Sequence, residues 1–311
     1  MDQYVCIFMA TYNGAAYIEE QLQSIANQTI KNWELVVSDD GSSDNTLEII
    51  QSFKLGRTDH RITIKNGPQL GFASNFMSMV NEYNGKANFF AFSDQDDIWN
   101  KNKLERAVLW LKNVDSNTPA LYCARTEFVN QYGQPFSPKA YSKLFVIKPC
   151  FENSLLQCIG GGNTMVFNKK AFELILKAKT VKPIPSHDWW LYQLVTGAGG
   201  IVYYDPQPCL LYRQHSDNLV GGNTSIMGRI SRALLFFKGV FASKNRDNIT
   251  NLNLNDNLLE ARNKLVLNLY SKACSSTRLH KRVLYFLNSN ARRQSSLENI
   301  IIFIGLILNK L

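Results

Sequence analysis

The chain has 311 residues, of which 45% are hydrophobic, so it can bury a core of its own and lacks the composition of a disordered protein. Its net charge of +9 is unevenly placed, because residues 224–311 hold fourteen Lys/Arg against four acidic residues. The longest apolar run, residues 300–308, is shorter than the ~18 residues that a spanning helix needs. We therefore expect the basic C-terminal segment to meet an anionic partner, either a membrane surface or a nucleic acid.

The first half of the chain alternates short apolar runs with runs of helical period. Strands are predicted at residues 5–9, 33–37, 61–65 and 88–92, and helices at 16–27, 45–53, 71–83 and 103–113. This alternation predicts an α/β fold with a mostly parallel sheet flanked by helices.

The second part is more mixed. Strands are predicted at residues 121–124, 164–167, 201–204 and 210–213, helices at 170–179 and 188–195, and a loop at 131–149. After Asn223 the sequence becomes helical and rich in Lys, Arg and Asn. We place a domain boundary there, which gives a first domain of residues 1–223 and a basic helical segment of residues 224–311.

The six cysteines show no CxxC spacing, and Cys6 and Cys123 lie in apolar runs. This pattern predicts reduced, intracellular thiols. The first residues follow a strand pattern and lack the basic and apolar regions of a signal peptide, so we expect a cytoplasmic chain.

Three predicted strands end in polar, turn-forming clusters. These clusters are Thr11-Tyr12-Asn13-Gly14, Asp39-Asp40-Gly41-Ser42 and Asp94-Gln95-Asp96-Asp97. Asp, Asn and Gly also favour turns and helix N-caps, which would explain any one cluster alone. Because ligands bind at the carboxyl ends of parallel strands, three such clusters at one edge predict a binding site.

The acidic cluster suits a hard divalent cation. Mg²⁺ or Mn²⁺ takes carboxylate and phosphate oxygens as ligands, and either ion would neutralise a diphosphate leaving group. We expect Asp96 or Asp97 to present its carboxylate to the metal, with Asp94 nearby. A helix N-cap would account for one of these three acids.

Asp39 and Asp40 have a less specific pattern. Either carboxylate could accept a hydrogen bond from a nucleotide base or a ribose hydroxyl, or could cap the helix that follows. No GxGxxG follows the first strand, which argues against a dinucleotide-binding site.

Further candidates lie in the second part of the chain. Asp188 is either a general base for an acceptor hydroxyl or an N-cap. Arg213 could stabilise a diphosphate, and His215 is either an additional metal ligand or a polar surface residue. The glycines at 160–162 with Asn163 form either an acceptor-site loop or a plain turn.

Taken together, these residues resemble family 2 glycosyltransferases with the GT-A fold, over about residues 4–220. The resemblance is carried by the blocks at 9–14, 28–29, 33–44, 92–99, 187–190 and 212–218, of which DDGS (39–42) and DQDD (94–97) are the most specific. The processive members carry QxxRW and several membrane spans, which this sequence lacks.

The resemblance implies an inverting enzyme with a nucleotide-sugar donor and Mg²⁺ or Mn²⁺. Thr11, Tyr12 and Asp40 would contact the nucleotide, with Asn13 and Asp39 beside them. The acids of the DQDD block would bind the metal and diphosphate, and Asp188 would be the catalytic base.

The segments SDQDDIW, HDWW and YRQHSDN look most like bacterial rhamnosyltransferases that use dTDP-L-rhamnose. Such enzymes extend a lipid-linked saccharide at the cytoplasmic membrane face to build O-antigen, capsule or cell-wall polysaccharide. The basic segment would then bind the membrane peripherally, or pack on the domain or another subunit. A UDP-hexose donor and a non-catalytic glycan- or nucleotide-binding module remain the alternatives. A nucleic-acid partner is disfavoured, because no recognisable module is present.

Overall fold

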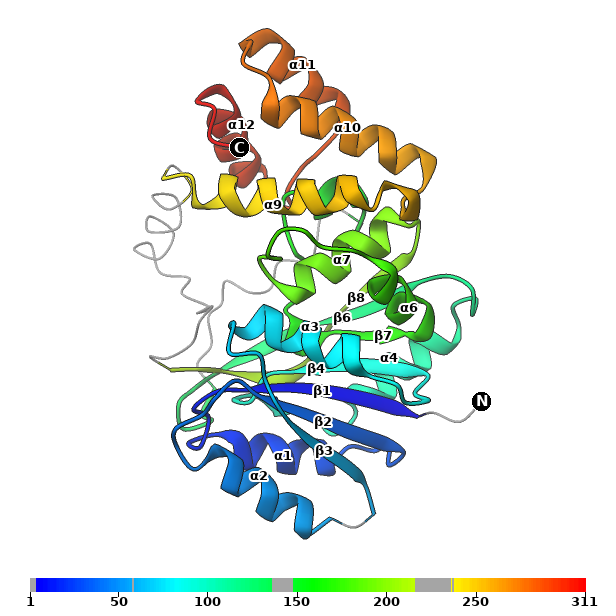
Figure 1. Cartoon of the computed structure of the whole chain (residues 1–311), viewed down its shortest axis with the longest axis vertical. Helices are drawn as coiled ribbons and strands as arrows, with labels where there is room; N and C mark the ends of the chain where they lie inside the picture. Colours follow the sequence, from blue (N-terminus) through cyan, green and yellow to red (C-terminus); the bar gives the residue numbers. More distant parts are fainter. Residues whose placement is uncertain (1–3, 58, 136–147, 216–235, 237) are drawn as a thin grey trace.

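The computed structural model describes residues 4–57, 59–135, 148–215, 236 and 238–311 (Figure 1). Its centre is an eight-stranded sheet with the order β3-β2-β1-β4-β7-β6-β8-β5. The strands are β1 (Val5–Thr11), β2 (Trp33–Asp39), β3 (Arg61–Asn66), β4 (Phe89–Ser93), β5 (Ile98–Trp99), β6 (Ala120–Asn130), β7 (Val166–Asn168) and β8 (Ile201–Gln214).

The sheet has a parallel half and a mixed half. β3, β2, β1 and β4 are all parallel, so β2 and β4 flank β1 and end at the same edge. β7 runs antiparallel to β4 and β6, β8 pairs parallel with β6, and β5 pairs antiparallel with β8. The predicted mostly parallel sheet is confirmed, and its parallel half is the part that carries the three polar clusters.

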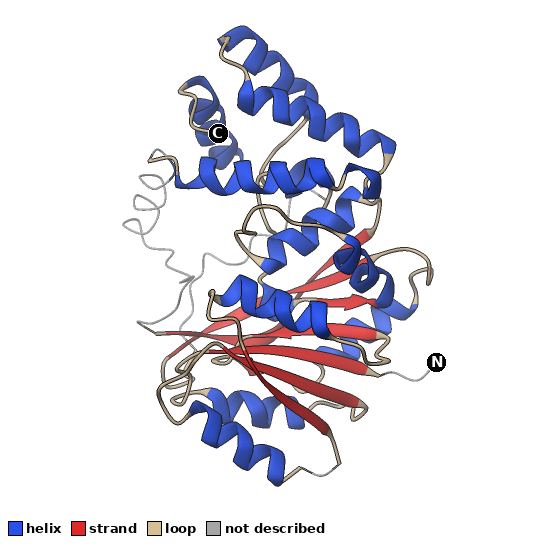
Figure 2. Cartoon of the chain, in the orientation of Figure 1, coloured by secondary structure: helices blue, strands red, loops and turns tan. Residues whose placement is uncertain are grey.

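Helices cover both faces of this sheet (Figure 2). One face packs against α1 (Ile18–Ala26), α2 (Thr46–Leu55) and α4 (Lys103–Lys112). The other packs against α3 (Phe72–Glu82), α6 (Lys169–Lys177) and α7 (His187–Gly197). Alternate side chains of β1 enter the two layers, Ile7 on the first side and Phe8 on the second, because strand side chains alternate between faces. A strand buried on both faces explains the continuous apolar run at its position in the sequence.

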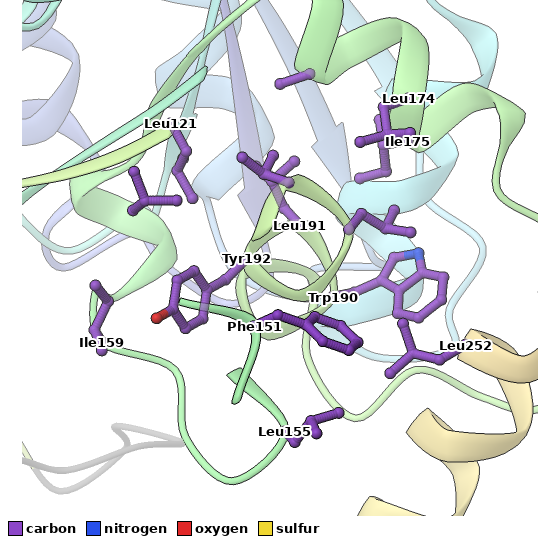
Figure 3. Packing of buried hydrophobic residues seen from close by; sticks show 14 of the residues in the cluster. Leu121, Phe151, Leu155, Ile159, Leu174, Ile175, Trp190, Leu191, Tyr192 and Leu252 are labelled. Carbon is purple, nitrogen blue, oxygen red and sulfur yellow. The ribbon is translucent and has the colours of Figure 1, made fainter. Parts of the chain in front are cut away.

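The C-terminal helices form a further layer over α7. They are α9 (Val240–Leu254), α10 (Ala261–Ser275), α11 (Leu279–Ser289) and α12 (Ser296–Ile307), with a short 3₁₀ turn, η3 (Asp256–Leu258). Figure 3 shows Trp190 and Leu191 of α7 packed in the same cluster as Leu252 of α9. The predicted helical C-terminal segment is therefore present, and it shares a core with the sheet domain.

Buried asparagines fasten this layer to the chain beneath it. The Asn251 side chain accepts the N–H groups of Val181 and Lys182 and donates to the Lys182 carbonyl. Asn255 does the same for Lys179, bonding both its N–H and its carbonyl. These contacts give two asparagines of the Asn-rich C-terminal sequence a structural role. The boundary that we predicted near Asn223 lies outside the described residues.

Two parts of the fold differ from the sequence prediction. β8 continues through residues 205–209, where two separate strands were expected, because its extra residues there bulge out opposite Arg125 of β6 and the pairing resumes after them. The two-residue β5 and the short α5 (Phe151–Ser154) and η2 (Gly162–Thr164) were not predicted. Among the described helices, none combines the length and the apolar character needed to span a membrane.

Candidate active site

The first two polar clusters meet at the edge where β1 and β2 end. The Thr11 hydroxyl donates to Asp39 Oδ1 at 2.8 Å, and the Asn13 N–H donates to the Ser42 hydroxyl at 2.8 Å. The third cluster joins them through Gln95, whose side-chain amide bonds both the N–H and the carbonyl of Tyr12 at 2.9 Å. The structure thus brings the three predicted clusters together in one bonded group of loops.

Asp39 holds these loops together through its hydrogen bonds. It is 4% exposed, and its two oxygens accept four hydrogen bonds. The donors are the hydroxyls of Thr11 and Ser42 and the backbone N–H groups of Gly41 and Ser42. A carboxylate with this many donors fixes the loop between β2 and α2.

Asp40 orders the neighbouring loop in a similar way. Its two oxygens accept the backbone N–H groups of Gln69 at 2.7 Å and Gly71 at 2.9 Å.

Tyr12 differs from both acids, because its side chain is 59% exposed at the edge of the site. An exposed aromatic ring beside fixed polar loops is suited to stack on a flat ligand such as a nucleotide base.

The Asp94–Asp97 loop after β4 gathers negative charge. Oxygens of Asp94, Asp96 and Asp97 lie within 4.8 Å of one another. Burial and the nearby Asp96 carboxylate raise the pKa of Asp94 to about 7, and the same causes raise the pKa of Asp97 well above its ordinary value. Such mutual repulsion is relieved when a cation binds, so the arrangement favours metal binding.

Asp97 is the buried member of the cluster. It is 0% exposed, Asn163 donates to its Oδ2 at 2.6 Å, and its Oδ1 has no hydrogen-bond partner. The Lys103 ammonium is also buried, donates to the Asn163 carbonyl and lies 3.3 Å from the centre of the Trp99 ring. Lys103 and Asn163 therefore support the acidic loop, and the Lys103 charge acts on both Asp94 and Asp97.

His215 and Arg213 reach the loop from the end of β8. The His215 ring bonds Asp96 at 2.8 Å, so the predicted additional ligand lies beside the predicted metal ligand. Arg213 is 2% exposed and donates to the carbonyls of Asp96 and Gln131 and to the Glu20 carboxylate. The structure thus uses this guanidinium to hold the Asp96 backbone, and its contact with a diphosphate stays a prediction.

Asp188 lies in the first turn of α7, near enough to the acidic loop that its charge helps to raise the pKa of Asp94. Its Oδ1 accepts the Trp189 N–H at 2.7 Å and its Oδ2 accepts the Gly162 N–H at 3.1 Å. Burial raises the pKa of Asp188 to about 6, which suits a general base at neutral pH. The N-cap of α7 is Ser186, so Asp188 is not the N-cap that the sequence alone allowed.

The segment 162–163 connects this acid to the acidic loop. Gly162 donates its N–H to Asp188, and the next residue, Asn163, bonds Asp97 and accepts from Lys103. A side chain at Gly162 would come within 2.4 Å of the buried His187 ring, so the close approach needs glycine. The sequence left this glycine run as either an acceptor-site loop or a plain turn. In the structure it links Asp188, the candidate base, to Asp97 of the candidate metal site.

Sequence reasoning missed the roles of Gln95 and Lys103. Gln95 lies between two candidate metal ligands, so its pattern did not suggest a structural link. Lys103 carried a usable signal: a lysine at the first position of a helix opposes the helix dipole, which hints at a partner elsewhere. The N-cap of α4 is Asn102, so none of the three acids caps that helix.

Comparison with known proteins fits this geometry. The model of the family described as glycosyl transferase family 2 matches residues 6–173. The dTDP-rhamnosyl transferase RfbG of Shigella flexneri is 32% identical over 231 residues, which cover 72% of this chain and 77% of that protein. The chain belongs to glycosyltransferase family 2. It is accordingly a glycosyltransferase, and rhamnosyltransferase-like in sequence.

Other similarities are shorter or concern the fold alone. The Escherichia coli glucosyltransferase WfgD, named for UDP-Glc and a GlcNAc-diphosphoundecaprenol acceptor, is 39% identical over 115 residues, 36% of this chain and 44% of that protein. The structure of S. aureus TarS with UDP-GlcNAc has a TM-score of 0.57 at 15% identity, covering 99% of this chain and 89% of that one. PcManGT from Pyrobaculum calidifontis, with GDP-Man and Mn²⁺, has a TM-score of 0.55 at 16% identity, covering 98% and 85%. Both confirm the predicted GT-A type fold.

Proposed function

We propose that this glycosyltransferase transfers L-rhamnose from dTDP-L-rhamnose, with inversion, to a lipid-linked saccharide in the synthesis of O-antigen, capsule or cell-wall polysaccharide. The observation that supports an inverting, metal-dependent transfer is the link at residues 162–163: Gly162 bonds Asp188 and Asn163 bonds Asp97. The observation that favours the donor is the similarity to a dTDP-rhamnosyl transferase over 72% of the chain.

The nucleotide is proposed to bind at the loops that Asp39 and Asp40 fix. Thr11 and Asn13 are bonded to the loop after β2, and Tyr12 presents its exposed ring beside them. The base would stack on that ring, and the two acids would accept from the base or the ribose on their remaining lone pairs. In this proposal Arg213 adds positive charge near the diphosphate while it holds Asp96 in place.

Mg²⁺ or Mn²⁺ is the proposed cofactor. The donor set fits a hard cation, because three carboxylates converge within 4.8 Å and the buried Asp97 Oδ1 lacks a hydrogen-bond partner. Asp96 and Asp97 would hold the ion, with His215 beside Asp96 and Asp94 in support. When bound, the ion would offset the charge that develops on the leaving diphosphate.

Asp188 is the proposed base of a one-step displacement. Its carboxylate removes the proton of the acceptor hydroxyl while that oxygen bonds to the anomeric carbon. The bond between the anomeric carbon and the phosphate oxygen breaks at the opposite face, and its electron pair leaves with the nucleoside diphosphate. The two N–H donors from Gly162 and Trp189 orient the carboxylate for this role.

A donor panel tests the proposal. Purified full-length protein is given dTDP-L-rhamnose, UDP-glucose, UDP-GlcNAc or GDP-mannose with Mn²⁺, and release of each nucleoside diphosphate is followed in the presence of a lipid-linked acceptor. We expect turnover with dTDP-L-rhamnose and its loss after chelation. Turnover with a UDP-sugar alone would refute the rhamnosyl donor and leave the glycosyltransferase class intact.

A UDP-hexose donor is the second candidate, and the similarity to the UDP-Glc-dependent WfgD favours it. That match covers half as much of this chain as the match to RfbG, so we rank it lower. A non-catalytic glycan- or nucleotide-binding module is a weaker alternative, since the bonded Asp188 and the acidic loop are both present. Failure of every donor with intact nucleotide binding would support the module.

A lipid-linked acceptor would place the enzyme at the inner face of the cell membrane. The proposal is a cytoplasmic protein in peripheral contact with an anionic membrane, supported by the basic composition of residues 224–311. Contact of the C-terminal helices with another subunit in a homo-oligomer is the alternative for that segment.

A further inference from the structure

From Ile300 to Ile307 the last helix, α12, is apolar on every side, but it is only half covered. On its inner side Ile302 is 1% exposed, Leu306 is 0% exposed, and Gly305 lies so close to Phe236 that a Cβ would come within 2.4 Å of the ring. This side is anchored in the core that the C-terminal layer shares with α7. The inner face therefore fixes how the helix is rotated.

The outer face of α12 carries a stripe of exposed aliphatic side chains. Leu297, Ile300, Ile304, Ile307 and Leu308 are 63%, 57%, 42%, 43% and 54% exposed. Their spacing of three or four residues puts them on one face, one turn after another. A helix that is apolar on every side is normally buried, so a covering partner is expected for this stripe.

The neighbouring helix α11 packs against α12, and this layer carries positive charge. The Arg282 guanidinium of α11 reaches the Ile307 carbonyl at 3.4 Å, which places α11 against α12. Lys281, in the first turn of α11, and Lys310, directly after α12, are both exposed.

The charge of this layer discriminates between the partners that could cover it. Residues 261–311 contain nine Lys/Arg and a single acidic residue, Glu298. Two copies of such a surface would repel each other, whereas an anionic lipid surface attracts the basic groups and accepts the aliphatic side chains between its headgroups. In Figure 1, α12 lies toward the side of the molecule at which β1 ends, the side of the candidate active site.

We propose that the outer face of α12 is a membrane-docking face that inserts its aliphatic side chains among anionic lipid headgroups. This inference deepens the proposed function, since a lipid-linked acceptor would be reached from that surface. It does not depend on the donor or on the chemistry, so it can fail or hold separately from them.

The test compares two double variants of the full chain. Ile300→Gln/Ile304→Gln removes apolar contact from the docking face without changing charge, and Leu55→Gln/Leu109→Gln makes the same kind of change at two leucines, 81% and 65% exposed, on α2 and α4. Each protein is sedimented with vesicles of phosphatidylcholine alone or mixed with phosphatidylglycerol, at low and high salt. Size-exclusion light scattering and melting temperature are measured on the same samples.

We expect the unmodified chain to bind only the phosphatidylglycerol vesicles, and less at high salt. The α12 variant should partition at least tenfold more weakly, whereas the control variant should bind as the unmodified chain does. Equal binding by both variants, no binding to anionic vesicles, or a dimer that the α12 variant abolishes would each overturn the proposal. Donor hydrolysis should be the same in all three proteins, so its loss throughout would count against the proposed function and not against the docking face.

Discussion

Two acidic loops follow strands that flank β1, and the same residue type behaves differently in each. Asp39, after β2, is surrounded by hydroxyl and N–H donors and accepts four hydrogen bonds. After β4, three carboxylates crowd within 4.8 Å, and the pKa values of Asp94 and Asp97 are raised by burial and by the charge of Asp96. The acid of the first loop is satisfied by donors of the protein itself, whereas the acids of the second loop form a cluster of carboxylates that could hold a cation.

The largest effect should come from Asp96. Asp96→Asn removes a charged oxygen ligand, so we expect transfer to fall about 10³-fold or more, because metal stabilisation of a leaving diphosphate contributes several kcal/mol. Nucleoside diphosphate release under saturating donor and Mn²⁺ measures this loss. The control is the melting temperature, which Mn²⁺ should raise in the unmodified protein and leave unchanged in the variant. Unaltered Mn²⁺ stabilisation of the variant would show that the ion binds elsewhere.

The next effect concerns the base. Asp188→Asn should lower kcat about 10²- to 10⁴-fold, the usual contribution of a general base, with little change in melting temperature. A base must be ionised, and burial raises the pKa of Asp188 to about 6, so kcat should rise with pH through about 6 and level off above it. A pH–rate profile checks the sign and the position. A rise of kcat centred near pH 4 in this profile, or full activity of Asp188→Asn, would exclude Asp188 as the base.

Asp39 should affect stability more than its neighbour. Asp39→Ala leaves the buried Thr11 hydroxyl and three partly buried donors without their acceptor, at about 1–3 kcal/mol for each group that stays unsatisfied, so we expect a total loss of about 3 kcal/mol. Asp40→Ala is the matched control, because its two bonds lie in a more exposed loop and should cost about 1 kcal/mol. Urea unfolding measures both free energies. An equal loss of stability in the two variants would show that Asp39 stabilises the fold no more than Asp40 does.

Substitution of Asp94 should have the smallest effect, and it should stabilise the metal-free protein where the Asp39 substitution destabilises it. The native pKa of Asp94, about 7, lies above the ordinary value, so its ionised form destabilises the metal-free fold near neutral pH. Stability should therefore fall as pH rises from about 4 to 7, and Asp94→Asn should recover about 1 kcal/mol at pH 7.5, after allowance for solvent screening of a partly exposed group. Unfolding with chelator present measures the gain, and Mn²⁺ should cancel it. A variant less stable than the unmodified chain would contradict this account.

The parallel half of the fold could be predicted because its signals are local. Apolar runs and helical periods placed β1 to β4 and the helices between them, and parallel strands necessarily bring their carboxyl ends to one edge. The candidate site residues at those ends were therefore found from the sequence. β5 was missed because two residues carry no period, and its pairing with β8 depends on tertiary placement.

The support of the site could not be predicted in the same way. Asn163 meets Asp97 from 66 residues away, and Arg213 reaches Glu20 from 193 residues away. Lys103 resembled an exposed residue at the start of a helix, yet it is fully buried beneath the acidic loop. Such contacts depend on how β7, α4 and β8 are packed, and no local pattern encodes that packing.

The sequence by itself determined which kinds of side chain stand at the strand ends, and hence the family and the class of reaction. Only the tertiary structure decided what each acid does there. Asp39 holds two loops together because donors from both surround it, whereas the acids after β4 lie close together in a buried loop, which raises the pKa values of Asp94 and Asp97. The physical reason is that a carboxylate's role depends on the donors and charges around it, which distant segments supply on folding.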